Sequence, residues 1–186
     1  MAKNIILNGA LAANTWTLIG AGTQGGNEEG QEAVITDNVI VPLATWLAIR
    51  DLPAHAKQRI GVWLAPADDP AQLADDVARL PLIAVQFPVF TDGRGYSIGR
   101  LLRERLGYKG ELRAIGDVGR DHLFNLFHCG FNAFEIKPSQ SAEQALAGLR
   151  AYSDGYQTSV ARPVPMYRRR SHAPTPDSWA TISSPS

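Results

Sequence analysis

The sequence has few of the residues and runs that build cross-linked or membrane-bound proteins. Cys129 is the single cysteine among 186 residues. This excludes an intramolecular disulfide, a cysteine zinc cage and an iron–sulfur cluster held by this chain alone. No apolar run approaches the roughly 18 residues that a membrane-spanning helix needs, and the first residues show no signal-peptide pattern. We therefore expect a cytoplasmic protein with no membrane partner.

An excess of charge of one sign is also missing. Lysine and arginine number 18, aspartate and glutamate also number 18, and the formal net charge is zero. Proteins that act on nucleic acid usually carry a basic excess. We therefore expect no nucleic-acid partner.

The common cofactor motifs are absent as well. The sequence contains no dinucleotide-binding glycine fingerprint, P-loop, nucleophile elbow, His-Glu-x-x-His or Cys-x-x-Cys. Its four histidines show no metal-ligand spacing. The cofactor, if the chain uses one, is unknown from these patterns, and no metal site is expected.

What is present divides the chain into three stretches. Residues 1–37 predict a small hairpin, with apolar runs at 5–7 and 16–19 around the Asn8-Gly9 turn, and then a glycine-rich loop. Residues 38–160 predict an α/β domain, for which a hydrophobic content of 45% supplies a core. Residues 161–186 form a basic tail, rich in proline and serine, that we expect to be disordered.

The α/β stretch alternates strand and helix patterns. The expected strands are residues 39–41, 60–64, 82–87, 111–115 and 133–136; the expected helices are 43–51, 68–79, 96–106, 117–129 and 141–153. Repeated βα units predict a parallel sheet, either open or forming half of a (βα)8 barrel, because a closed barrel usually needs about 250 residues. The open edges of a half-barrel favour a homodimer or another covering partner.

Ligands of parallel α/β sheets bind at the carboxyl ends of the strands. The loop of residues 92–97 stands out there, because Gly93 and Gly95 flank Arg94 next to an expected helix, and this pattern suits an oxyanion or phosphate group. A simpler role for Asp117 is the N-cap of the helix 117–129. The candidate ligand-binding residues are Gln86, Gly93, Arg94, Gly95, Ser97 and Arg120, and the candidate catalytic residues are Asp92, Tyr96 and Asp117.

The segment 94–120 carries a local basic excess. It contains seven basic residues and three acidic ones, which suggests an anionic ligand or an acidic protein surface. The alternative is that Arg100, Arg103 and Arg105 only solvate the outer face of an amphipathic helix.

Several segments resemble a known family. They are residues 82–88 (Leu-Ile-Ala-Val-Gln-Phe-Pro), 90–97 (Phe-Thr-Asp-Gly-Arg-Gly-Tyr-Ser), 100–105, 110–118, 120–121 and 129–131, with 39–43 and Trp46 upstream. Over residues 38–170 the chain is similar to domain-of-unknown-function family 934. These are proteobacterial proteins named as oxidoreductases of sulfite reduction and typically encoded beside the sirohaem-containing sulfite reductase. Gly99 and His122 stand where the resemblance leads us to expect alanine and glutamine.

The resemblance leaves two functions open. In the first, the protein is an accessory partner of assimilatory sulfite reductase or its electron donor, and the segment 94–120 and Arg168–Arg170 meet an acidic surface. In the second, it is a small oxidoreductase or other enzyme, with an oxyanion or a phosphate-bearing ligand on the loop 92–97. Asp92 or Asp117 is then the acid or base, and Tyr96 is a donor.

Overall fold

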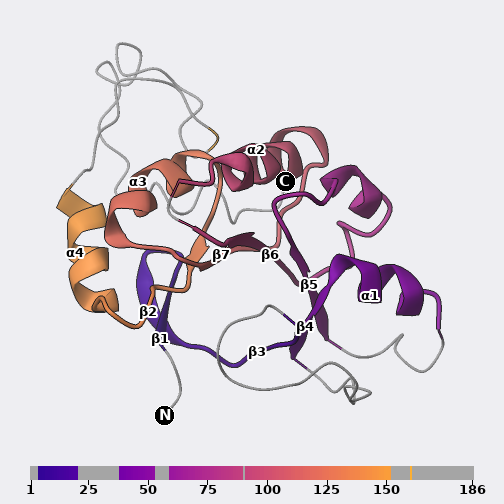
Figure 1. Cartoon of the computed structure of the whole chain (residues 1–186), viewed down its shortest axis with the longest axis horizontal. Helices are drawn as coiled ribbons and strands as arrows, with labels where there is room; N and C mark the ends of the chain where they lie inside the picture. Colours follow the sequence, from indigo (N-terminus) through magenta and orange to yellow (C-terminus); the bar gives the residue numbers. More distant parts are fainter. Residues whose placement is uncertain (1–3, 21–37, 53–58, 90, 152–159, 161–186) are drawn as a thin grey trace.

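The computed structural model describes residues 4–20, 38–52, 59–89, 91–151 and 160. Eight strands make a single sheet in the order β2-β1-β8-β7-β6-β5-β4-β3 (Figure 1). Their bounds are β1 Asn4–Leu7, β2 Ala10–Ala13, β3 Thr17–Leu18, β4 Val39–Pro42, β5 Ile60–Leu64, β6 Leu82–Phe87, β7 Glu111–Gly116 and β8 Ala133–Phe134. The glycine-rich residues 21–37 and the tail with Arg168–Arg170 lie outside the described residues.

The six strands β3 to β8 are parallel and follow one another in sequence order. This confirms a mixed α/β fold and the five strands expected from residue 38 onward, although β8 ends two residues early. β4, β5 and β6 are buried almost throughout, as expected of strands covered on both faces.

The first arm and the turn of the predicted amino-terminal hairpin are confirmed, but its second arm is not. Asn8 and Gly9 have φ angles of 48° and 74°, which is the conformation that an Asn-Gly turn provides. The second arm is β2, however, and not residues 16–19, because two turn residues pair Leu7 with Ala10. β1 also pairs antiparallel with β8, so the hairpin belongs to the same sheet as the α/β residues.

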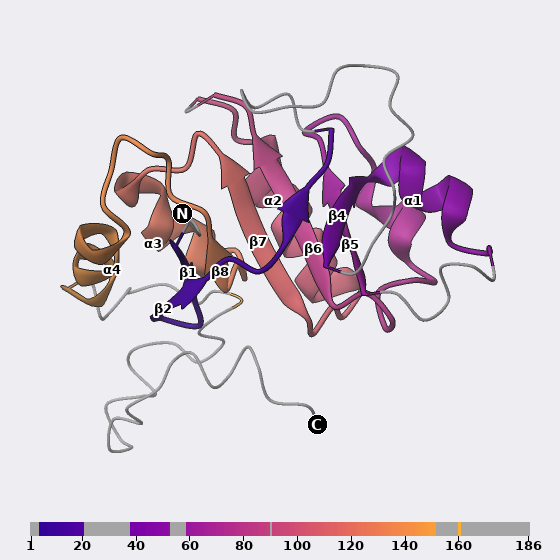
Figure 2. The ribbon, with the colours of Figure 1, turned by 90° about the horizontal axis from the view of Figure 1, so that it is seen from below.

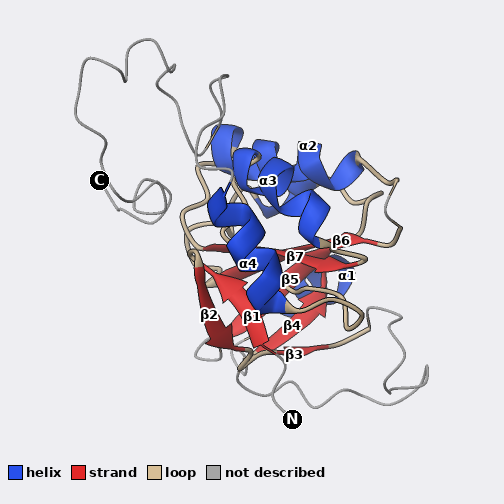
Figure 3. Cartoon of the chain, turned by 90° about the vertical axis from the view of Figure 1, so that its left-hand side faces the viewer, coloured by secondary structure: helices blue, strands red, loops and turns tan. Residues whose placement is uncertain are grey.

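Four α-helices are found in the described residues: α1 Leu43–Ile49, α2 Arg94–Arg100, α3 Arg120–His128 and α4 Ala142–Ala151. α2 continues into a π-helical turn, η3, at Leu101–Arg105. The helices lie on the outer face of the sheet (Figure 3), where they share the main apolar core with alternate strand residues such as Val85 and Ala114.

Two helix predictions need correction. Residues 68–79 form a short 3-10 helix, η2 Pro70–Leu73, and then successive turns. Pro70, Leu73 and Asp76 are buried at a spacing of three, which suits a helix with three residues per turn. The helix expected from residue 117 begins at Arg120 with Gly119 as its N-cap, so Asp117 does not have that role. The N–H of Gly119 is accepted by Nδ1 of His122, a bond that a glutamine at this position can also make.

The sheet is curled into a half-barrel whose two edges lie near each other. β2 forms one edge, β3 forms the other, and three residues, 14–16, connect them. A connection of this length spans at most about 14 Å. It runs across the inner face of the sheet, in front of β7 and β6 (Figure 2), over a second apolar cluster of Ile40, Trp63, Leu82, Ala84 and Ile115.

Candidate functional site

The carboxyl ends of β6, β7 and β8 bring polar residues onto one row of the inner face. Gln86 pairs in register with Ile115. The N–H of Glu135 donates to the carbonyl of Ala114 (3.0 Å), so the β7–β8 ladder continues beyond β8. Because side chains alternate along strands, Gln86 and Glu135 flank Ile115 on the inner side. The sequence selected Gln86 but missed Glu135, because the strand was expected to continue beyond it.

Asp117 and Lys137 form the next polar layer at the same strand ends. Lys137 Nζ lies 3.0 Å from Asp117 Oδ1, and both side chains are about one-third exposed. Gly116, which precedes Asp117, has a φ of 98°, and a Cβ there would lie 2.4 Å from the carbonyl oxygen of Phe87. The backbone thus fixes Asp117 against the end of β6, where its N–H donates to that same oxygen (2.7 Å).

Asp92 and Arg94 are paired with each other. The Arg94 guanidinium donates from Nε to Asp92 Oδ1 (3.0 Å) and from Nη2 to Oδ2 (2.7 Å), and the Arg94 N–H also donates to Oδ1 (3.1 Å). These bonds lower the pKa of Asp92 below its usual value. The pair occupies the bidentate face of Arg94 that the sequence assigned to an anion, and the anion-binding role stays a prediction.

Gly95 and Gly99 allow close packing, whereas a Cβ on Gly93 would meet nothing within 4 Å. The helix begins at Arg94, with Gly93 as N-cap, so Gly95 lies in its first turn. A Cβ on Gly95 would lie 2.5 Å from the Phe87 ring, and one on Gly99 would lie 2.4 Å from the Phe131 ring. Tyr96 packs edge-on against Phe87 at 5.4 Å, and burial raises the pKa of its hydroxyl. Ser97 is exposed.

Arg120 is at the start of α3, where its contacts are with Gln140 and Asp121. Its N–H donates to Gln140 Oε1 (2.8 Å), and its guanidinium lies 3.5 Å from Asp121 with both side chains mostly exposed. Of the predicted site residues, the structure therefore pairs Asp92 with Arg94 and pairs Asp117 with Lys137, which was not predicted. The other predicted side chains, Gln86, Tyr96, Ser97 and Arg120, lie outside these two ion pairs.

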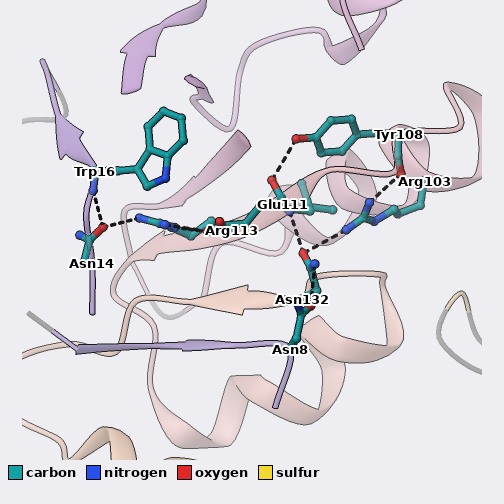
Figure 4. A network of polar contacts seen from close by, with 9 residues as sticks. Asn8, Asn14, Trp16, Arg103, Tyr108, Glu111, Arg113 and Asn132 are labelled. Atoms are coloured by element: carbon teal, nitrogen blue, oxygen red, sulfur yellow. Dashed lines mark hydrogen bonds and ion pairs between the residues drawn. The ribbon is translucent and has the colours of Figure 1, made fainter. Parts of the chain in front are cut away.

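The basic segment 94–120 does not form one basic surface. Arg103 is largely buried and donates to the carbonyls of Tyr108 (2.6 Å), Gly110 (3.0 Å) and Gly130 (2.8 Å). Arg113 is 1% exposed and is held by Glu111 at 2.6 Å (Figure 4). The solvated-face interpretation is right for the exposed Arg100 and Arg105 and wrong for Arg103.

The loop between β6 and α2 exposes apolar surface next to the Asp92–Arg94 pair. Pro88 is exposed and Val89 is 53% exposed, which makes Val89 one of three large exposed hydrophobic residues in the described part of the chain. Arg94 is 63% exposed, while its partner Asp92 is 11% exposed. We call Pro88, Val89, Asp92 and Arg94 the rim loop.

Other candidate chemistry is not supported by its surroundings. Cys129 is half-buried, and burial raises the pKa of its thiol, whereas a nucleophilic cysteine needs a lowered pKa. No group of three or more metal-ligand side chains occurs within the described residues. No helix in that part of the chain has the length and apolar character to cross a bilayer.

The fold and the rim loop define a mixed α/β protein with a curled, mainly parallel sheet and paired charges at its strand ends. A family model described as a bacterial protein of unknown function, DUF934, matches residues 61–167, more than half of the chain. The protein belongs to this family. No curated protein matches the sequence. The matched region begins within β5, so it includes both ion pairs but not the hairpin, β3 or β4.

Proposed function

We propose that the protein is an accessory component of assimilatory sulfite reduction, which binds sulfite reductase or its electron donor through the rim loop. The sulfite-reduction context comes from the resemblance of the segments at 82–88 and 90–97. The observation that supports a binding role is the exposed side chain of Val89, which lies near an ion pair, Asp92–Arg94, whose two charges already neutralise each other.

Protein interfaces combine an apolar centre with a polar rim, and arginine is enriched in them. Val89 and Pro88 supply apolar surface, and Arg94 supplies an exposed cation at its edge. The two bonds from Arg94 to Asp92 hold the guanidinium in one orientation, so less conformational entropy is lost on binding. The remaining edge of the guanidinium, Nη1, can contact an acidic group of the partner.

A binding assay with matched variants tests this role. The protein is mixed with sulfite reductase, and separately with its electron donor, and the complex is measured by size-exclusion chromatography and titration calorimetry. Val89→Asp places a charge at the centre of the proposed interface and should weaken the complex by at least tenfold. Leu52→Asp is the control, because Leu52 is 48% exposed but follows α1, which returns the chain to the amino ends of the parallel strands, away from the rim loop.

Two outcomes would overturn the proposal. One is the absence of a complex with either protein at micromolar concentrations. The other is an equal loss of binding for Val89→Asp and Leu52→Asp. Retained binding with Leu52→Asp and lost binding with Val89→Asp supports the rim loop as the interface.

An enzyme is the second candidate, favoured by the position of the two ion pairs at the carboxyl ends of parallel strands, where α/β enzymes place their ligands. In that function an oxyanion would replace Asp92 on Arg94. Displacement from Arg94 would remove the bonds that lower the pKa of Asp92, so the freed carboxylate would be a stronger base, and the raised pKa of Tyr96 keeps its hydroxyl protonated as a donor. Sulfite or phosphate binding by the isolated protein, lost in Arg94→Ala, would favour this function over the accessory one.

A further inference from the structure

Residues 14–19 cross the inner face of the curled sheet, and we call them the strap. They leave the β2 edge, pass over β7 and β6 (Figure 2), and include β3, which pairs with β4 and forms the other edge. Trp16 and Leu18 are half-buried against the inner apolar cluster, and the Arg59 guanidinium lies 5.4 Å from the Trp16 ring. The strap therefore covers the inner face.

One side chain joins the strap to the middle of the sheet. Asn14 Oδ1 accepts from Nη1 of Arg113 (2.9 Å) and from the N–H of Trp16 (3.1 Å) (Figure 4). Arg113 is itself immobilised, because Glu111 Oε1 accepts from its Nε (2.7 Å) and lies 2.6 Å from its Nη2. Asn14 thus links a half-buried strap to a guanidinium that is 1% exposed.

The other attachments are at the far end of the strap. Thr17 and Ile19 donate backbone N–H groups to the carbonyls of Asn38 and Ile40 (both 2.9 Å), and the indole of Trp63 donates to the Ile19 carbonyl (2.8 Å). Among the strands that the structure describes, β3 has two residues and one pairing partner, whereas β6 has six residues and a strand on each side. Segments with few buried contacts open locally before the whole protein unfolds.

We propose that the strap is a detachable closure of the half-barrel and that Asn14 is the residue that latches it. Opening breaks the bonds of Thr17, Ile19 and Asn14, and with them the pairing of β3 with β4, while β4 to β8 stay paired. It exposes the inner apolar face formed by Ile40, Trp63, Leu82, Ala84 and Ile115. The inner apolar face is thus covered while the strap is attached, and it becomes exposed when the strap detaches, without global unfolding.

Amide hydrogen exchange measured residue by residue tests the latch. In the unaltered protein, Thr17 and Ile19 should exchange at least tenfold faster than the β6 amides. Asn14→Ala should accelerate Thr17 and Ile19 by a further tenfold and leave β6 unchanged. Asn14→Asp keeps an oxygen acceptor for Arg113 and Trp16 and should restore slow exchange, and Thr15→Ala, at an exposed strap position, is the matched control.

A second readout separates opening from unfolding. Asn14→Ala should bind an apolar fluorescent dye and increase acrylamide quenching of tryptophan, with an unchanged far-ultraviolet circular dichroism spectrum. The proposal is overturned if the strap amides exchange at the rate of β6, or if Asn14→Ala accelerates strap and β6 equally. It is also overturned if Asn14→Asp exchanges as fast as Asn14→Ala.

Discussion

Three arginines from one short segment have three different roles. Arg94 is exposed and paired with its neighbour Asp92, Arg103 is buried against backbone carbonyls, and Arg113 is enclosed within the curled sheet. The sequence shows the basic excess but not these three roles, because helix periodicity does not show which arginine lies against the carbonyls of a neighbouring loop. Arg103 lies in the π turn that continues α2. Such a turn shifts the side chains relative to their positions in a regular helix.

The Asp92–Arg94 pair predicts a measurable titration. Arg94 lowers the pKa of Asp92 mainly through side-chain hydrogen bonds. A carboxyl whose pKa is lower in the folded protein contributes stability above its unfolded pKa of about 3.9, and this is lost as the pH falls through the folded pKa. Carboxyl-carbon NMR should place the titration midpoint of Asp92 below the ordinary value for an aspartate. In Arg94→Gln the Asp92 midpoint should return to the ordinary value; an unchanged midpoint would show that the pair does not form in solution.

Arg103 predicts a loss of stability with no loss of charge. Burial lowers its pKa to about 10, so the guanidinium stays charged at neutral pH. Arg103→Lys keeps that charge but cannot reach three carbonyls with one ammonium group, and should lower the free energy of unfolding by about 3 kcal/mol. Urea unfolding measures this, with Arg105→Lys, at an exposed position, as the control. Equal stability of the two variants would contradict a structural role for Arg103.

At the scale of elements, the sequence predicts which strands and helices exist better than it predicts where they begin and end. β4, β5 and β6 are predictable because their apolar runs are continuous or nearly so, and β7 is predictable from its apolar residues although Arg113 interrupts them. Residues 68–79 were assigned to a helix because Leu73 and Val77 have helical spacing, but burial follows Pro70, Leu73 and Asp76. The last of these is an aspartate, which no apolar pattern reveals: it accepts from the Trp46 indole (2.9 Å) and from Arg50 (3.0 Å). The positions of the two ion pairs are partly predictable because the ends of the strands are predictable. The bond between Asp92 and Arg94 is not, because it depends on the conformation of the loop.

The contact between α2 and Phe131, in the connection from α3 to β8, predicts a coupled pair of substitutions. Gly99→Ala brings a Cβ to within 2.4 Å of the Phe131 ring, and overpacking of this kind costs about 1–3 kcal/mol. Phe131→Leu in the same chain should recover part of this loss, because the smaller side chain gives the methyl group room. Thermal unfolding of the two single variants and the double variant measures the coupling; additive losses would contradict the close approach.

At the scale of the whole molecule, the strap changes the expectation for assembly. The open edges of a half-barrel favour a homodimer or another covering partner. Here the strap covers the inner face from within the chain, and this cannot be deduced from the sequence, where residues 16–19 resemble the second arm of a hairpin.

Native mass spectrometry tests the consequence for assembly. The unaltered protein should have the monomer mass of 20.1 kDa, and Asn14→Ala should populate dimers as the inner face opens, at concentrations where Thr15→Ala remains monomeric. A dimer of the unaltered protein would instead support the homodimer that the open edges suggest.

The pairing of the hairpin with β8 also has a consequence for synthesis. The amide of Asn132 donates to Asn8 Oδ1 (3.0 Å) across 124 positions of the chain, and β1 finds its partner strand at residues 133–134. An isolated two-stranded hairpin is marginally stable, and β1 and β2 are translated well before the strand that completes their pairing. Contacts between such distant segments form slowly, so we expect the hairpin to join the sheet late in folding.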